Sequence, residues 1–297
     1  MTTTSSGAPS APAYTHAVDF DALPPRFDML IDELLTHLFS DGALNKALSG
    51  TASEMAAILR AIPIQEGRML ERGIALIAGL DPDLEVLTQN LRLPITKTAI
   101  ELVALNDPTL YRSLTLDADS GGRKSFTPDL ILVNRKTQLA HVVDVKRSLG
   151  SYEVSRINDL KSRMLAAALV VPDFLYKEHH RLPVKDVLVV IINAENQRAD
   201  FDGGVWPLSH LDHLVEVAGA GRAIGMLRER FHSRIEECWK QAREAFAAPK
   251  GEAACHGLQP EPAVSDESDG QGVVPFDRAA RSHIRIGFAR MPRSDAG

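Results

Sequence analysis

The chain has 297 residues, of which 44% are hydrophobic and 24% are charged. This composition is typical of globular proteins and excludes fibrous and wholly disordered classes. The formal net charge of −6 argues against a protein that coats nucleic acid through its overall charge. Two cysteines, Cys238 and Cys255, are too few for a disulfide framework or a multi-thiolate zinc site.

Neither a membrane segment nor a secretion signal is expected. No apolar run approaches the roughly 18 residues that span a bilayer. The segment 1–10 lacks the basic and apolar regions of a signal peptide. We therefore expect a cytoplasmic protein that does not enter a membrane.

The two ends of the chain differ in composition from its middle. Residues 1–25 are rich in Ser, Thr, Ala and Pro, which predicts a disordered leader. Residues 248–297 combine an acidic stretch with a basic end, which predicts a flexible tail that either contacts a partner or nucleic acid or is inert. The folded unit is then 26–247, with a helical part at 26–63 and a core at 64–247.

Three helices are expected at the start of this unit. Apolar residues at helical spacing predict a helix over 27–38. Thr51 and Glu54 match a capping box, which predicts a second helix that ends before Pro63. A third helix is expected over 64–78, closed by a glycine.

The core pattern then changes to short strands and helices. The expected elements are a strand at 84–93, a helix at 95–105, an irregular connection at 108–122, strands at 130–133 and 139–145, a helix at 152–170, a strand at 187–192 and a helix at 222–246. The five residues between the two central strands indicate a hairpin. This order of elements predicts an α/β fold with a mixed central sheet flanked by helices.

Basic residues are concentrated in the middle of the chain. Residues 120–165 contain nine basic and four acidic side chains, a local charge of +5 in an acidic protein. Such a stretch is typical of a phosphate-binding face, and a solvated surface without a ligand is the alternative. The nine are Arg123, Lys124, Arg135, Lys136, Lys146, Arg147, Arg156, Lys161 and Arg163.

The hairpin carries the residues that indicate chemistry. Paired residues of an antiparallel hairpin have a constant sum, and pairing Asp129 with Asp144 centres the turn between Lys136 and Thr137. Side chains alternate along a strand, so Asp144 and Lys146 share a face. Opposed carboxylates are destabilising unless a cation lies between them. A hard divalent ion such as Mg²⁺ suits this oxygen donor set, and the lysine can orient or activate an attacking water.

At these residues the chain resembles the PD-(D/E)xK nuclease superfamily. The stretch Pro128 to Lys146 is similar to its core hairpin, most closely that of archaeal-type Holliday-junction resolvases, and Gly67 to Arg72 is similar to the Gly-x-x-x-Glu-Arg of the first core helix. The resemblance covers about 64–192. It implies a restriction-endonuclease-like core, which the composition and periodicity described above extend by an N-terminal helical part and disordered tails.

The resemblance also implies a metal-dependent deoxyribonuclease that hydrolyses phosphodiester bonds. Asp129, Asp144 and the carbonyl of Val145 would ligate Mg²⁺ or Mn²⁺. Lys146 would orient or activate the attacking water, and Glu71 would add a carboxylate. DNA is the expected partner, and a homodimer is an expectation because such nucleases often dimerise to cut two strands.

The helix carboxylate has two candidates by position. Glu71 shares a helix face with small residues that would allow close approach to a sheet. Glu66 shares the face of Leu70 and Ile74, and either glutamate can instead be a solvated surface carboxylate. The expected phosphate contacts are Arg123, Lys124, Arg147, Arg156 and Lys161, with Arg163 on the same helix as the last two.

Two other functions remain open at this point. One is a nuclease-fold module that binds nucleic acid or a protein partner without cutting, although such a module has no need for opposed carboxylates. The other is a nucleotide-binding enzyme that uses the glycine-rich turn 219–225, whose glycine spacing departs from the dinucleotide-binding pattern.

Overall fold

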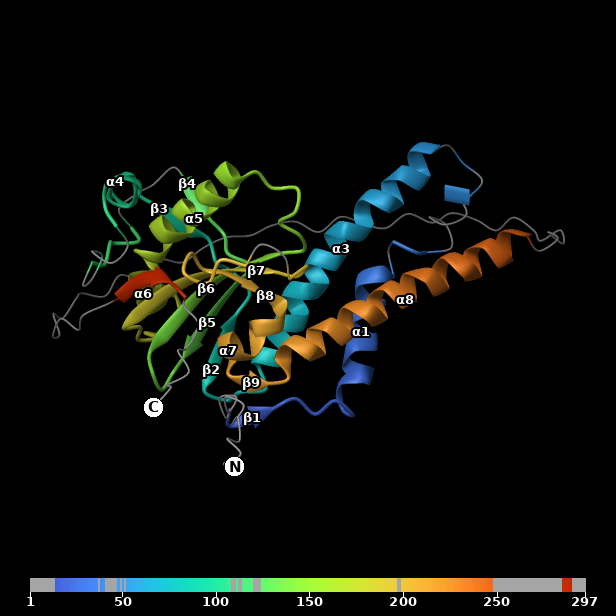
Figure 1. Cartoon of the computed structure of the whole chain (residues 1–297), viewed down its shortest axis with the longest axis horizontal. Helices are drawn as coiled ribbons and strands as arrows, with labels where there is room; N and C mark the ends of the chain where they lie inside the picture. The colour runs from blue at the N-terminus through green and yellow to red at the C-terminus, as the bar shows by residue number, and fades with distance from the viewer. Residues whose placement is uncertain are drawn as a thin grey trace, which may run out of the picture.

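A computed structural model describes residues 14–36, 38–40, 47–48, 50, 52–107, 111, 114–119, 124–196, 199–247 and 285–289. Within these ranges the protein is a mixed α/β fold with helices on both faces of a mixed sheet (Figure 1). None of the helices described is long and apolar enough to cross a membrane.

The central sheet has six strands in the order β10-β7-β6-β5-β2, with β8 also paired to β7. Its strands are β2 (Leu84–Leu87), β5 (Leu130–Asn134), β6 (Leu139–Lys146), β7 (Asp186–Asn193), β8 (Val205–Pro207) and β10 (Arg285–Phe288). Strands β2, β5 and β6 pair in antiparallel fashion, whereas β7 is parallel to β6, β8 and β10. The mixed sheet predicted from the sequence is therefore confirmed.

The β5–β6 hairpin has the predicted register. Leu130 pairs with Val143 and Asn134 pairs with Leu139, so the turn is centred between Lys136 and its neighbour as the constant sum requires. Asp129, directly before β5, donates its backbone N–H to the carbonyl of Val143 at 3.1 Å. The register places Asp129 level with Asp144 at the open end of the hairpin.

Alternation along the strands divides the core into two layers. Leu130 and Leu132 pack on one face of β5, and Ile131 and Val133 pack on the other. The first face is covered by α1, α3 and α8, and the second by α4, α5 and α6 (Figure 1). These helices are α1 (Leu23–Leu35), α3 (Ala52–Ala78), α4 (Lys97–Leu105), α5 (Val154–Ala168), α6 (Val171–Glu178) and α8 (Ala220–Ala247).

The predicted break before Pro63 is wrong, because α3 is one helix of 27 residues with Pro63 inside it. Proline removes a backbone donor and normally interrupts a helix. Here Ile58 and Ile62 pack against Trp239 and Ala242 of α8, and this burial offsets the cost of the proline. Thr51, the expected N-cap, lies outside the described residues.

Several short elements were not predicted. The expected strand 84–93 is instead β2 followed by a separate β3 (Leu93–Ile95), which pairs with β4 (Lys124–Phe126) in a second small sheet. The expected helix 152–170 gives α5 and the additional α6, whose first turn contains Pro172. The predicted β7 and α8 are confirmed within two residues at each end.

Segments near both ends contribute to the fold, contrary to the expected boundaries. The leader was predicted to extend to residue 25, but β1 (His16–Ala17) pairs with β9 (Val217–Ala218), and α1 begins at Leu23 with prolines in its first turn. The tail was predicted to be flexible from 248, but β10 pairs with β7. Apart from Arg285 in β10, the basic residues of the tail lie outside the described residues.

The glycine-rich turn before α8 has an internal partner. Gly219 has a φ of +84°, a conformation that favours glycine. The backbone N–H groups of Gly219 and Gly221 donate to the carboxylate of Asp212 at 2.6 and 2.7 Å. This carboxylate from α7 (Leu211–Val215) occupies the start of α8, where a nucleotide phosphate would have to bind.

Candidate active site

The two predicted aspartates meet where the hairpin ends between the two helical layers. Asp129 is half-buried, and its Oδ2 accepts the backbone N–H of Val145 at 2.6 Å. Asp144 lies on the neighbouring strand and is only 4% exposed. Burial and the charge of Asp144 raise the pKa of Asp129 to about 6. The hairpin thus holds two like-charged groups together in a poorly solvated place, which has an electrostatic cost.

Lys146 is the cation nearest to these carboxylates. Its ammonium group forms an ion pair with Asp144 Oδ1, and no other donor in the described part of the chain reaches that oxygen. Burial acts to lower the pKa of Lys146, but the carboxylates of Asp144 and Asp129 outweigh burial and leave the pKa raised. The lysine is therefore a charged ammonium beside the two acids, as the alternation along β6 predicted.

Glu71 on α3 is the third carboxylate of this group. Burial and the charges of Asp129 and Asp144 raise its pKa to about 7, while Lys146 acts in the opposite direction. The side chain therefore lies within electrostatic reach of both aspartates. Of the two helix glutamates considered from the sequence, Glu71 is the one placed at the hairpin.

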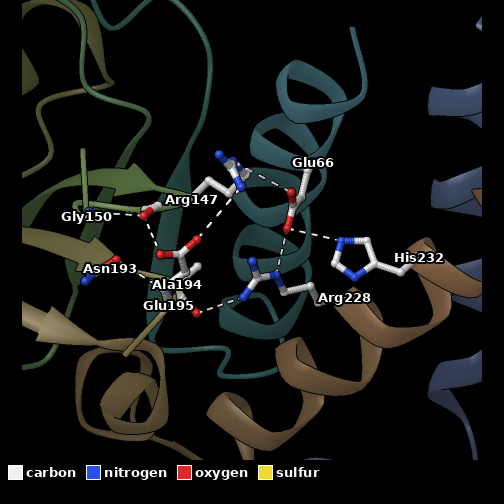
Figure 2. Close-up of polar contacts among 9 residues, drawn as sticks. Glu66, Arg147, Gly150, Asn193, Ala194, Glu195, Arg228 and His232 are labelled. Atoms are coloured by element: carbon white, nitrogen blue, oxygen red, sulfur yellow. Dashed lines mark hydrogen bonds and ion pairs between the residues drawn. The ribbon is translucent and has the colours of Figure 1, made fainter. Parts of the chain in front are cut away.

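Glu66 belongs to a different polar network, drawn in Figure 2. Its Oε1 accepts a hydrogen bond from Arg228 Nε at 2.7 Å, and Arg147 and His232 lie 3.8 and 3.4 Å away. Arg228 also donates to the carbonyl of Ala194 at 3.1 Å. Glu66 therefore joins α3 to α8 and to the ends of β6 and β7, and it does not face the aspartates.

The five predicted phosphate contacts lie in different surroundings. Arg156 lines a cavity with Asp144, but Lys161 forms an ion pair with Asp200 at 2.8 Å. Arg147 lies 3.8 Å from both Glu66 and Glu195. Lys124 is exposed on β4, and Arg123 lies outside the described residues. Only Arg156 of the five is placed beside the hairpin carboxylates with no partner among the described residues.

Two cavities adjoin the carboxylates. The first, here called the α3-side cavity, has a volume of 770 Å³ and is lined by Glu71 and Asp129 together with residues of α1 and α3. The second, the α5-side cavity, has a volume of 460 Å³ and is lined by Asp144 and Lys146 together with residues of α5 and β4. The aspartate pair is therefore accessible from both helical layers.

Some residues of the site were not found from the sequence. Tyr152 lines the α5-side cavity just before α5 begins, and no local pattern distinguishes it from a core aromatic residue. Glu195 and Arg228 complete the network around Glu66. They come from the end of β7 and from α8, and only the tertiary fold brings them there.

A second group of side chains that can bind a metal lies away from the hairpin carboxylates. Among the described residues, His16, Asp81 and Asp83 alone form a trio of such side chains with ligand atoms all within 4.8 Å of one another. The ammonium of Lys136 lies 2.5 Å from Asp83 and supplies a cation to this group. Glu71, Asp129 and Asp144 are spaced more widely than this trio, so a shared ion would require their side chains to converge.

The carboxylates at the hairpin fit a hard divalent cation. They offer oxygen donors of the kind that Mg²⁺ and Mn²⁺ prefer, and burial together with the neighbouring carboxylates raises the pKa values of Asp129 and Glu71. No family model matches the chain, and no curated protein or solved structure was found to match it.

Proposed function

We propose that the protein is a metal-dependent nuclease that hydrolyses phosphodiester bonds in DNA, with a restriction-endonuclease-like core. The observation that carries this proposal is the pairing of Asp129 with the buried Asp144 at the end of one hairpin, with Lys146 beside them. A module that only binds DNA has no use for two poorly solvated like charges, whose cost is offset when a cation binds between them.

The residues have distinct roles in this proposal. Asp129 and Asp144 would hold the ion, the carbonyl of Val145 would be a further ligand, and Glu71 would add negative charge from α3. When bound, Mg²⁺ or Mn²⁺ supplies Lewis acidity to the phosphate and lowers the pKa of water.

Lys146 has the remaining role, at the attacking water. Its ammonium orients the water oxygen that would form the new P–O bond, while the P–O bond to the leaving sugar oxygen breaks and that oxygen takes up the proton that the attacking water loses. The Asp144–Lys146 ion pair keeps this ammonium beside the acids before substrate binds.

Cleavage of a labelled DNA panel tests the proposal. Linear, supercoiled, branched and single-stranded DNA are incubated with Mg²⁺ or Mn²⁺ and with the wild type, Asp144→Asn or Lys146→Ala. We expect cleavage by the wild type alone. Retention of DNA without cleavage of any panel member by the wild type would instead support the alternative of a non-cleaving binding module.

A further inference from the structure

The α5-side cavity has the size and recess of a site for one small ligand. Its volume of 460 Å³ falls within the range of ligand pockets, roughly 300 to 1,000 Å³. Asp144 and Lys146 both line it, and Asp144 is 4% exposed while the Lys146 side chain is 24% exposed. A phosphate must therefore enter the cavity to reach these groups.

Two arginines give one wall of this cavity a preference for anions. Arg156 and Arg163 are seven residues apart on α5, line the cavity and are exposed. Neither guanidinium group forms an ion pair or hydrogen bond with another described residue, whereas the ammonium of Lys161 on the same helix is paired with Asp200. The guanidinium groups are therefore available for phosphate oxygens, which arginine binds through two parallel hydrogen bonds.

The rest of the lining suits a nucleoside. Tyr152 is half-buried at the cavity, within electrostatic reach of Lys146. An aromatic ring beside a basic wall is the combination on which unpaired bases stack. Asp159 lies on the same wall as Arg156 and offers acceptor oxygens to a base amino group.

We propose that the α5-side cavity binds one unpaired nucleotide of the substrate strand, so that single-stranded or frayed DNA is the preferred substrate. This inference rests on the function proposed above and specifies its substrate class. A nucleotide that remains in a duplex carries its paired partner with it, and a recessed pocket accepts a nucleotide only when it is single-stranded or turned out of the helix.

Fluorescence anisotropy measures the proposed contacts directly. A labelled oligothymidylate and a blunt duplex of equal length are titrated with protein in Ca²⁺, which supports binding without requiring turnover. We expect the wild type to bind the single strand more tightly. Arg156→Ala/Arg163→Ala should weaken single-strand binding at least roughly ten-fold and reduce the slope of log K against log salt by about 1.4, since about 0.7 is lost per phosphate contact.

Two further variants separate stacking from charge. Tyr152→Ala should weaken single-strand binding by about ten-fold without changing the salt slope, and Tyr152→Phe should restore the affinity. The matched control, Arg181→Ala/Arg243→Ala, removes the same charge from exposed positions outside the cavity and should change affinity less than about three-fold. All four variants are first compared with the wild type by circular dichroism.

The results distinguish this inference from the proposed function. Tighter binding of the duplex, or equal losses for the cavity and control pairs, would overturn the nucleotide pocket even if metal-dependent cleavage is observed. Selective loss in the cavity variants supports the pocket, and it does so even if the wild type cleaves nothing, in which case the nuclease proposal fails and the pocket stands.

Discussion

At the scale of single residues, two aspartates and one lysine define the site at the hairpin. Asp129, Asp144 and Lys146 could be placed from the sequence, because strand alternation and the constant sum of a hairpin determine their positions. Glu71 and Glu66 could not be distinguished in this way. Which of them faces the hairpin depends on how α3 packs, and α8 supplies the arginine that binds Glu66.

The raised pKa of Glu71 predicts a pH-dependent cost to the apo protein. Its pKa of about 7 exceeds the ordinary 4.5, so the folded state binds this proton more tightly than the unfolded state. The ionised side chain then destabilises the fold above pH 7, and the cost disappears as the pH falls towards 4.5. Glu71→Gln should therefore raise the melting temperature at pH 8 in EDTA and raise it much less at pH 5.

Thermal unfolding of both proteins across this pH range checks the prediction. Glu33→Gln is a suitable control, because the Arg72 hydrogen bond lowers the pKa of that exposed carboxyl and its replacement should not stabilise the protein. A constant difference between wild type and Glu71→Gln from pH 5 to 8 would contradict the assigned environment of Glu71.

At the scale of elements, the long helices α3 and α8 extend beyond the sheet together (Figure 1). Gly73 permits their close approach, since a Cβ there would lie 2.4 Å from Leu227 Cδ2. The helical periodicity of both segments is readable from the sequence. Their mutual packing is not, and for this reason the sequence wrongly predicts that a helix ends before Pro63.

The Glu66 network should contribute more stability than the exposed ion pairs that also involve α8. Glu66 is buried and binds the partly buried Arg228, so Glu66→Leu leaves that guanidinium without its carboxylate. We expect a loss of about 1–3 kcal/mol in the free energy of unfolding. Asp28 pairs with Arg230 near the surface, and Asp28→Ala should cost less than about 1 kcal/mol.

Chemical denaturation of the two variants measures this difference. Leucine at position 66 keeps a side chain of similar size, so the comparison reports mainly on charge and hydrogen bonding. Equal losses of stability in the two variants would contradict the larger contribution expected of the Glu66 network.

At the scale of the whole molecule, the sheet is completed by segments distant in sequence. The hairpin and β7 have long β-branched runs that the sequence reveals. By contrast, β8 and β10 have three and four residues, too short for a periodic pattern. Strand β10 also follows α8 by more than thirty residues, so its pairing with β7 has no local signal.

Removing residues 284–297 should destabilise the protein. Trp206 is 2% exposed, and its indole N–H donates to the carbonyl of Ala289 at 2.9 Å. Loss of this acceptor from a buried donor costs about 1–3 kcal/mol, in addition to the lost pairing of β10. We expect a red-shifted tryptophan emission and a lower midpoint of denaturation, whereas removal of 290–297 alone should preserve both. Unchanged emission after the longer deletion would contradict the pairing of β10.

The proposed function depends on metal-dependent chemistry at the hairpin. Its most direct test is the Mg²⁺-dependent cleavage rate of Asp144→Asn, measured together with DNA affinity in Ca²⁺. Because a bound metal contributes several kcal/mol to the transition state, we predict a loss in rate of at least about a thousand-fold with DNA affinity largely retained. Cleavage at the wild-type rate by Asp144→Asn would contradict the assignment of the active site.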